Sequence, residues 1–436
     1  MKPYMLLAAA AIALCGCSKS QTTQTTADTA NQTQAAETAQ NTKDTAMPSE
    51  NCKPATSSNA TTEMWAAANN AFGFEMLKAT NPSSSVVVSP YSVERAMGML
   101  LEGACGDTAA EIQKALKLPN ANNNSQAGAE IEAEILKTLD DNHTIDIDNH
   151  LWIQQSYKLR DEYIQNVKKF YAAAPETVDF AGATEESRKH INDYIAQVTH
   201  DKIRDILPAN AVTSLTRLIL TNAVYFKGPW RHSFKENATQ KADFRTAAGT
   251  IQVDMMHHTE SHAFCETDKL VAFDMDFAAA NYSMMIMMPK IGATSDVAAA
   301  LTDLEKDLSS ISFKQIRAQM KSGQVSLYMP KFKVEFGASL KTMLRELGVQ
   351  SAFSNPDFSA ITGTRELYLD DVLHKAFIDV NENGAEAAAA TAVVMKLRSA
   401  LPMREPHTIT VDHPFVFAIV EKSTQTILFI GRVTTI

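Results

Sequence analysis

Apolar side chains recur at helical spacing between residues 64 and 80. The face that they form consists of Trp65, Ala68, Phe72, Met76 and Leu77. Such a stripe predicts an amphipathic helix, which Asn81 and Pro82 would end. Further helices are expected over residues 91–102, which Gly103 would terminate, and over 111–118, 128–139, 160–171 and 185–198.

Strand-like runs dominate the chain from residue 218 onward. The expected strands span residues 86–89, 143–154, 218–226, 251–256, 269–275, 282–289, 325–334, 376–380, 408–411, 415–421 and 427–433. Runs of helices followed by runs of strands favour an α+β fold over a repeated βαβ scheme. No linker interrupts residues 65–436, so we expect one large domain there.

Residues 385–397 admit two structural interpretations. Their alanine content favours a helix. At a period of two, however, one face is small and then apolar, while Glu386 and Lys396 fall on the other face. That first face holds Ala385, Ala387, Ala389, Thr391, Val393 and Met395. The segment could therefore enter a sheet as a strand, and Gly384 would supply a swivel at its base.

The region around this segment resembles the reactive-loop hinge of the serpins, a family of protease inhibitors. It reads Glu-Asn-Gly-Ala-Glu and then alanines from residue 382, downstream of His-Lys-Ala at 374–376. Further motifs similar to the family's are Ser-Pro-Tyr-Ser at 89–92, the turn at 103–110, the run at 220–230, Val-Asp-His-Pro-Phe-Val-Phe at 411–417 and Leu-Phe-Ile-Gly-Arg-Val at 428–433. Several motifs in the expected order are more specific than any one of them.

The resemblance implies a fold and a domain organisation. It covers residues 65–436 and implies three β-sheets with eight or nine helices and an exposed C-terminal reactive loop. We expect a signal peptide over residues 1–17, a disordered tether over 18–62 and a serpin domain over 63–436, with the reactive loop at about 382–407. The resemblance also implies a monomer that uses no cofactor.

Counting from the hinge glycine predicts the bond that a protease would cut. Serpins usually place this bond fourteen positions after that glycine, which indicates Arg398 and Ser399. An arginine fits a specificity pocket floored by a carboxylate, so the implied partner is a trypsin-like serine protease. Lys396, Met395, Met403 and Arg404 are rival positions, and Leu397 before Arg398 also suits a papain-like cysteine protease.

The mechanism implied by the family is suicide inhibition. The protease forms an acyl-enzyme at Arg398, and the freed loop inserts as a new strand of the main sheet. The hinge residues are Glu382, Gly384, Ala385, Glu386, Ala387, Ala388, Ala389, Ala390 and Thr391. They include no proline, and a charge appears after Gly384 only at Glu386, so insertion is expected. Two departures from the usual hinge, Asn383 and Ala385, are mild.

Other residues match structural positions of the family. Ser89, Ser92, Asn222 and His374 match a hydrogen-bonded cluster beneath the point where the sheet opens. Trp230 matches the top of that opening, where Lys331 and Glu382 would bridge. A surface ion pair of little energetic value is the competing interpretation of this last pair.

The N-terminus indicates export. Lys2 and the apolar stretch from residue 5 to 14 are typical of a secretory signal. Leu-Cys-Gly-Cys at 14–17 resembles a bacterial lipobox, which predicts a lipid on Cys17; an ordinary signal peptide is the alternative. Ser18 then favours the outer membrane or cell surface. The Thr-, Gln- and Ala-rich tether could extend roughly 40 Å as a flexible coil.

Composition limits the remaining possibilities. A net charge of −10 gives no electrostatic reason to bind nucleic acid. Cys52, Cys105 and Cys265 form no paired framework, so no structural disulfide is expected. His257, His258 and His262 together could bind a metal, but no Cys or carboxylate lies at ligand spacing, so we interpret them as a solvated loop and expect no metal site. No nucleophile elbow, His-Glu-x-x-His or phosphate loop occurs, which disfavours a hydrolase, whereas a lipoprotein adhesin or a non-inhibitory carrier serpin remains an alternative.

Overall fold

The computed structural model describes residues 58–137, 144–173, 175–279, 281–292, 295–385 and 405–436. These residues form ten α-helices in the described part of the chain. The helices are α1 (Thr62–Ala79), α2 (Pro90–Gly103), α3 (Gly106–Ala115), α4 (Asn124–Lys137), α5 (Asp161–Tyr171), α6 (Thr184–Val198), α7 (Val297–Asp307), α8 (Ser310–Gln319), α9 (Lys341–Glu346) and α10 (Ser359–Thr362), with 3-10 turns η1 (Glu236–Ala238) and η2 (Ser351–Phe353).

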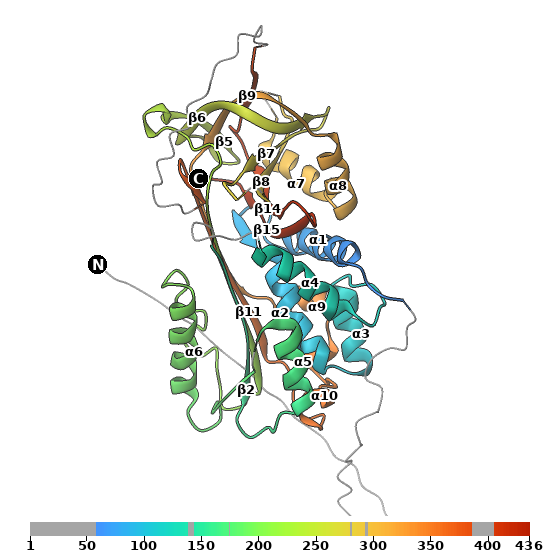
Figure 1. Ribbon diagram of the computed structural model, residues 1–436. Helices are drawn as coiled ribbons and strands as arrows, with labels where there is room; N and C mark the ends of the chain where they lie inside the picture. The colour runs from blue at the N-terminus through green and yellow to red at the C-terminus, as the bar shows by residue number, and fades with distance from the viewer. Residues whose placement is uncertain (1–57, 138–143, 174, 280, 293–294, 386–404) are drawn as a thin grey trace, which may run out of the picture. The chain divides into compact units, whose positions relative to one another are not determined.

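A six-stranded sheet forms one layer of the fold. Its strands, in spatial order, are β10 (Phe332–Ser339), β11 (Asp371–Asn381), β12 (Gly384–Ala385), β4 (Leu218–Pro229), β2 (Thr144–Gln154) and β3 (Glu176–Val178). Helix α6 lies against one face of this sheet, and α2 lies on the opposite side (Figure 1).

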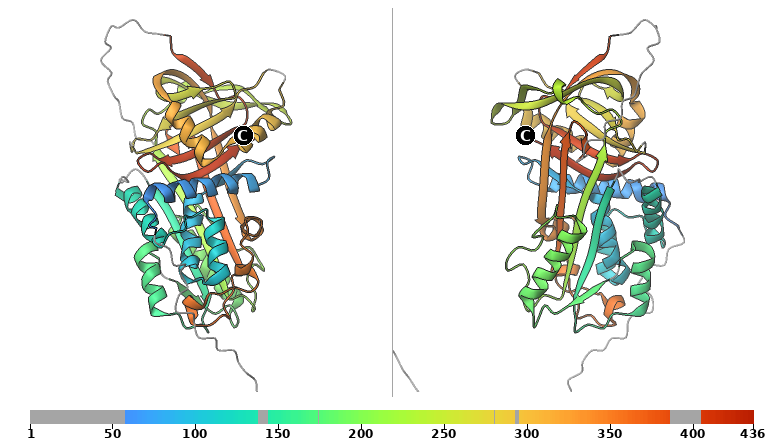
Figure 2. Two further views of the ribbon diagram at one scale, coloured as in Figure 1. Left: turned by 90° about the vertical axis from the view of Figure 1, so that its right-hand side faces the viewer. Right: turned by 60° about the vertical axis from the view of Figure 1, so that its left-hand side comes forward.

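A nine-stranded sheet completes the β structure among the described residues. Its path runs β1 (Val86–Val88), β15 (Thr426–Val433), β14 (Phe415–Glu421), β8 (Tyr282–Pro289), β7 (Leu270–Asp276), β6 (Gly249–Glu266), β9 (Lys321–Pro330) and β13 (His407–Thr410), and β5 (Gln240–Thr246) pairs with β6. Every residue of β14 and β15 is buried, and α1 crosses beside them (Figure 2).

The α+β class is confirmed, with three differences in detail. The described residues form ten α-helices and not the eight or nine implied, two of them being the short helices α9, of 6 residues, and α10, of 4 residues. The three sheets implied by the family resemblance form two hydrogen-bonded sheets, because the long strand β6 pairs with β5, β7 and β9 together. The single strand expected over residues 325–334 is two strands, β9 and β10, since Pro330 has no N–H to continue the ladder.

Local signals explain several helix starts. Ser89 accepts a hydrogen bond from the Ser92 N–H and so caps α2, with Pro90 at the first helical position. Asp296 caps α7 in the same way. Ser309 and Ser312 form a reciprocal capping box at α8. Caps of this kind fix where the chain enters each helix.

Two sequence expectations are wrong. His257, His258 and His262 lie on β6 and not in a loop. Cys105 is disulfide-bonded, although no disulfide was expected. Its partner lies outside the described residues, because Cys265, the other cysteine described, is a free thiol. A count of cysteines does not show which of them approach one another in space.

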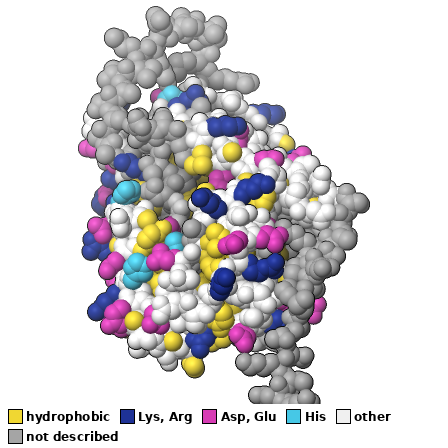
Figure 3. Space-filling model, turned by 60° about the horizontal axis from the view of Figure 1, so that its bottom comes forward, with side chains coloured by type: hydrophobic (Ala, Val, Ile, Leu, Met, Phe, Trp, Pro, Cys, Tyr) yellow, Lys and Arg dark blue, Asp and Glu magenta, His cyan; other side chains and the backbone are white. Residues whose placement is uncertain are grey.

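The described helices include no membrane span, and the face shown in Figure 3 carries charges of both signs. No described helix combines the length and the hydropathy needed to cross a bilayer. On the face shown in Figure 3, basic and acidic side chains are intermingled. The residues expected to form a signal peptide and most of those expected to form a tether lie outside the described residues, although Ser58 already donates a hydrogen bond to the Asn120 carbonyl.

Candidate functional site

Strands β4 and β11 pair in parallel in the middle of the six-stranded sheet. Their register runs from Ile219 opposite Asp371 to Tyr225 opposite Phe377. We call these paired residues, 219–225 and 371–377, the seam. Parallel pairing is slightly less stable per residue than antiparallel pairing. The seam is therefore a place where an added antiparallel strand could improve the hydrogen bonding of the sheet.

Strand β12 separates β4 from β11 beyond one end of the seam. Ala385 pairs with Val380 on one side and with Gly228 on the other. Because β12 is antiparallel to both neighbours, a strand that continued in its direction would run into the seam. Ala385 is fully buried, so the position suits a small apolar side chain.

Gly384 makes a close backbone approach that requires glycine. Its φ is +153°, and an added Cβ would lie 2.1 Å from the Gly228 carbonyl oxygen. A side chain here would clash with main chain, which cannot move out of the way as a flexible side chain can. The sharp turn from β11 into β12 thus depends on this residue.

Glu382, in the turn between β11 and β12, is held by two polar side chains. Its carboxylate lies 2.9 Å from Lys331 Nζ and accepts a hydrogen bond of 2.7 Å from the Thr239 hydroxyl. Burial raises the pKa of Glu382, but the hydrogen bonds from Lys331 and Thr239 outweigh it and leave the pKa below its usual value. The Glu382 side chain is only 6% exposed, so this is more than a surface ion pair.

Aromatic residues hold the main chain of the same turn. The Trp230 N–H donates to the Asn383 carbonyl, and its indole Nε1–H donates to the Asn381 carbonyl, both at 2.9 Å. The Trp230 ring stacks on Phe277 with centroids 4.6 Å apart. The Phe234 N–H donates to the Glu382 carbonyl at 2.9 Å. We call Lys331, Thr239, Trp230 and Phe234 the seat of the turn.

The four residues expected to cluster beneath the opening do come together. Asn222 on β4 lies directly opposite His374 on β11, and their side chains are hydrogen-bonded across the seam. Asn222 also donates to Ser92, whose N–H bonds the Ser89 hydroxyl. The Ser89 hydroxyl in turn donates to the Leu428 carbonyl at 2.7 Å. This polar cluster joins both seam strands to α2 and β15.

The hydrogen bonds show which ring nitrogen of His374 carries the proton. The Ser89 main-chain N–H can only donate, so His374 Nε2, 3.2 Å away, is the acceptor. The proton is therefore on Nδ1 and is donated to Asn222 Oδ1. Burial lowers the pKa of His374 to about 3, so the ring is neutral at physiological pH.

Sequence reasoning missed three contributors to this region. Asn149 on β2 lies opposite Asn222 and accepts from it. Thr239 and Phe234 belong to the seat of the turn. Asn149 lies between an aspartate and a histidine of β2, so it carries no distinguishing signal, and nothing local indicated the other two.

Helix α6 covers the seam on the face opposite α2. Ile191 and Ile195 of the helix belong to a buried apolar cluster with Ala223 of β4 and Leu373 of β11. The segment after α6 adds Ile203 and Leu207 to this cluster. The right-hand view of Figure 2 shows the helix in front of the long strands. Separation of β4 from β11 must therefore disturb the packing beneath α6.

The bond that we expect a protease to cut, between Arg398 and Ser399, lies outside the described residues. So do residues 386–391 of the hinge and the rival positions Met395, Lys396, Met403 and Arg404. The chain is described again from Glu405, and β13 pairs in parallel with β9 from His407 onward. His407 stacks on Phe264 and lies 3.3 Å from Glu266. The two described ends of the loop thus belong to different sheets.

Comparisons with known proteins agree with this arrangement. A family model described as "Serpin (serine protease inhibitor)" matches residues 67–436. An uncharacterized serpin-like protein of Thermococcus kodakarensis is 37% identical over 83% of this chain and 84% of its own length. Leukocyte elastase inhibitor A of Mus musculus is 33% identical over 85% of this chain and 99% of its own length. The crystal structure of Serpin48 of the insect Tenebrio molitor superposes with a TM-score of 0.74 at 29% identity, covering 86% of this chain and 98% of that one.

Proposed function

Because the chain belongs to the serpin family, whose members generally act on proteases, we propose that it is a suicide-substrate inhibitor of trypsin-like serine proteases. The observation that carries the proposal is the position of β12. It lies between β4 and β11, at the end of a seam in which these strands otherwise pair directly. A freed loop could lengthen β12 along the seam.

The covalent step takes place at Arg398. The serine hydroxyl of the protease attacks the Arg398 carbonyl carbon and forms an ester with it. The peptide bond to Ser399 breaks, and the Ser399 nitrogen leaves as an amine after it takes up a proton. Arg398 is favoured over Lys396, Met395, Met403 and Arg404 by its spacing from Gly384, and its guanidinium suits a pocket floored by a carboxylate. Leu397 makes a papain-like cysteine protease a second possible target.

Insertion then supplies the driving force for trapping. Each main-chain N–H and C=O group that now bonds across the seam between β4 and β11 would exchange a partner on a parallel strand for one on the new antiparallel strand. The small residues at 385 and 387–390 would pass beneath α6 without a bulky group to stop them. The bound protease would travel with Arg398 as the loop enters the sheet.

We further propose that the protein is anchored through a lipid on Cys17. The lipobox-like Leu-Cys-Gly-Cys ending and Ser18 support this location at the outer membrane or cell surface. Residues 18–62 would then act as the tether of a monomeric inhibitor domain over residues 63–436.

Mixing the protein with trypsin tests the proposed inhibition. Denaturing electrophoresis should show a band at the summed mass of both proteins. The loss of trypsin activity should be proportional to the amount of this covalent complex. Cleavage of the chain while trypsin stays fully active would refute the inhibitor function and leave a substrate or carrier. Papain, assayed in parallel, distinguishes the two protease classes.

A further inference from the structure

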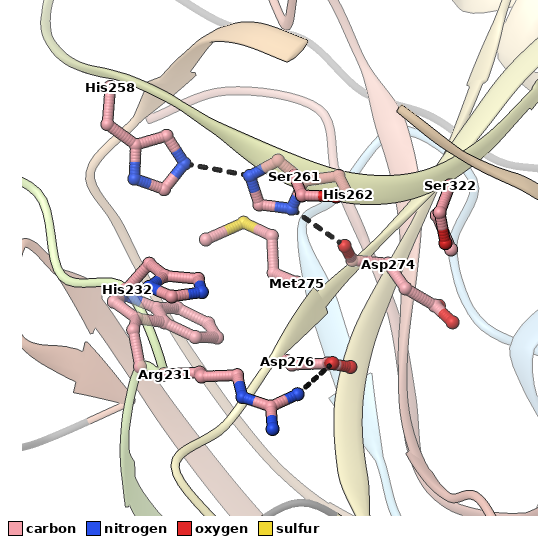
Figure 4. A pocket seen from close by; sticks show the side chains of 11 residues that line it. Arg231, His232, His258, Ser261, His262, Asp274, Met275, Asp276 and Ser322 are labelled. Atoms are coloured by element: carbon pink, nitrogen blue, oxygen red, sulfur yellow. Dashed lines mark hydrogen bonds and ion pairs between the residues drawn. The ribbon is translucent and has the colours of Figure 1, made fainter. Parts of the chain in front are cut away.

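A cavity of about 240 Å³ opens beside Trp230, next to the seat of the turn. His258 and His262 of β6 enter it from one wall (Figure 4). His232, Ser261 and Ser322 also line the cavity. No role in protease inhibition accounts for two histidines on this wall.

The two imidazoles converge on each other. Their Nε2 atoms are 3.0 Å apart. His262 Nδ1 lies 3.0 Å from the Asp274 main-chain carbonyl. A carbonyl can only accept, so His262 carries its proton on Nδ1 and its Nε2 has a free lone pair. His258 must then supply the proton between the two rings from its own Nε2.

In this arrangement the second ring nitrogen of His258, Nδ1, is poorly hydrogen-bonded. When the proton of a neutral His258 is on Nε2, its Nδ1 is a bare acceptor. That Nδ1 atom is buried and makes no close hydrogen bond among the described residues, although the Ser233 main chain acts on the ring as a hydrogen-bond acceptor. An unpaired polar atom in a buried position costs free energy. A group that took the place of the shared proton would allow His258 to move its proton to Nδ1, where the Ser233 main chain can accept it.

We propose that His258 and His262 bind a divalent transition-metal ion of the Zn²⁺ type through their Nε2 atoms. Two imidazole nitrogens on a tetrahedral Zn²⁺ lie about 3.3 Å apart, close to the observed separation. Imidazole is a preferred ligand for such ions. Donation of the remote ring proton to a main-chain carbonyl, as His262 shows, is the usual orientation of a metal-binding histidine.

The metal would have two protein ligands and two positions for water. The carboxylates that line the cavity are already paired, Asp274 with Arg317 at 3.2 Å and Asp276 with Lys422 at 2.8 Å. No group of three or more His, Cys, Asp or Glu among the described residues is arranged to hold a metal. Ser261 and Ser322 line the cavity and could hydrogen-bond the bound waters.

The protonation states favour metal binding near neutral pH. Burial, followed by the nearby histidines, lowers the pKa of His258 to about 3, and the Ser233 main chain acts in the opposite direction. Burial also lowers the pKa of His262. Burial thus disfavours the protonated form of both rings, which would compete with a metal ion for their lone pairs.

The site is connected to the seat of the turn. The His258 ring stacks on Phe234 with centroids 4.0 Å apart and an angle of 13° between planes. The Phe234 N–H donates to the Glu382 carbonyl. A metal that fixed His258 would hold Phe234 and stabilise the native state by mass action.

Titration calorimetry of the metal-free full chain with Zn²⁺ tests the site. We expect one ion per chain with a micromolar dissociation constant, and a higher unfolding temperature in its presence. His258→Gln and His262→Gln should each weaken binding at least tenfold. His257→Gln is the matched control, because His257 stacks on Tyr328 and bonds Ser326 outside the cavity. Absence of binding, or binding unchanged in both variants, would overturn the proposal.

A second measurement on the wild-type chain covers variants that fail to fold. Cu²⁺ with ascorbate oxidises residues next to the bound ion, and mass spectrometry should locate the damage at His258 and His262. Damage that spares both histidines would refute the site. Neither readout uses protease inhibition, so failure here is distinguishable from failure of the proposed function.

Discussion

His374 donates its Nδ1 proton to Asn222 across the seam, so one buried side-chain hydrogen bond joins the two strands that insertion would separate. The same Asn222 amide group donates to Ser92 and Asn149. The polar cluster therefore holds the sheet closed at the place where the proposed inhibitory mechanism would open it.

Replacement of Asn222 by alanine should destabilise the closed state. The His374 Nδ1–H would lose its buried acceptor, at a cost of about 1–3 kcal/mol in the free energy of unfolding. Urea denaturation followed by circular dichroism measures the change. Asn355→Ala, at an exposed position, is the control and should stay within about 0.5 kcal/mol of wild type. Equal stabilities of the two variants would contradict the role of the cluster.

Acid should weaken the fold through His374. Its pKa is about 3 in the folded protein, against an ordinary value of 6.5. Between these values the unfolded chain binds more protons at this site, so stability rises with pH by about 1.4 kcal/mol per unit. The contribution is complete above pH 6.5 and is lost progressively as the pH falls toward 3. From pH 6.5 to 5 the loss is roughly 2 kcal/mol.

A variant without this titration provides the comparison. His374→Asn should be less stable than wild type at pH 7, yet its stability should fall less steeply between pH 6.5 and pH 5. Urea denaturation at both pH values gives the two slopes. Parallel slopes for variant and wild type would mean that His374 titrates normally in the folded chain.

Replacement of Arg398 by alanine should abolish trypsin inhibition. A specificity pocket built for a charged side chain rejects a substrate that lacks it by roughly 10⁴-fold. The second-order rate constant for loss of trypsin activity measures the effect, and the unfolding temperature should not change. Lys396→Ala is the matched control, since it removes a nearby positive charge but leaves Arg398, the residue after which we expect trypsin to cut. Inhibition that is lost in Lys396→Ala and retained in Arg398→Ala would show that trypsin cuts after Lys396 and not after Arg398.

Parts of the fold and the site could be predicted because their signals are local. The apolar run that becomes β4, the Ser-Pro start of α2 and the closing strand β15 all lie close to their expected positions. The meeting of Ser89, Ser92, Asn222 and His374 was also predicted, but it followed from the family resemblance. Their spacing in the sequence carries no such information.

The errors arise where tertiary structure overrides local pattern. The second half of β6 carries histidine, threonine, serine and glutamate, so it does not look like a strand, yet pairing with β9 makes it one. The competing interpretation of Lys331 and Glu382 as a surface pair also fails, because the burial of Glu382 depends on the turn that Trp230 holds. The Cys105 disulfide was missed because a count of cysteines does not show which of them meet in space.

Replacement of Ala385 by arginine should convert the inhibitor into a substrate. Ala385 is fully buried between β4 and β11, and a guanidinium there would have to leave water without a partner. Each 1.4 kcal/mol added to the insertion barrier slows insertion about tenfold, so hydrolysis of the acyl-enzyme would win. The stoichiometry of inhibition should therefore rise by about tenfold or more, with cleavage at Arg398 retained. Ala247→Arg, at an exposed position between β5 and β6, should trap trypsin as wild type does. Efficient trapping by Ala385→Arg would show that the loop does not enter the sheet through the position where β12 begins, even if trypsin cuts at the expected bond.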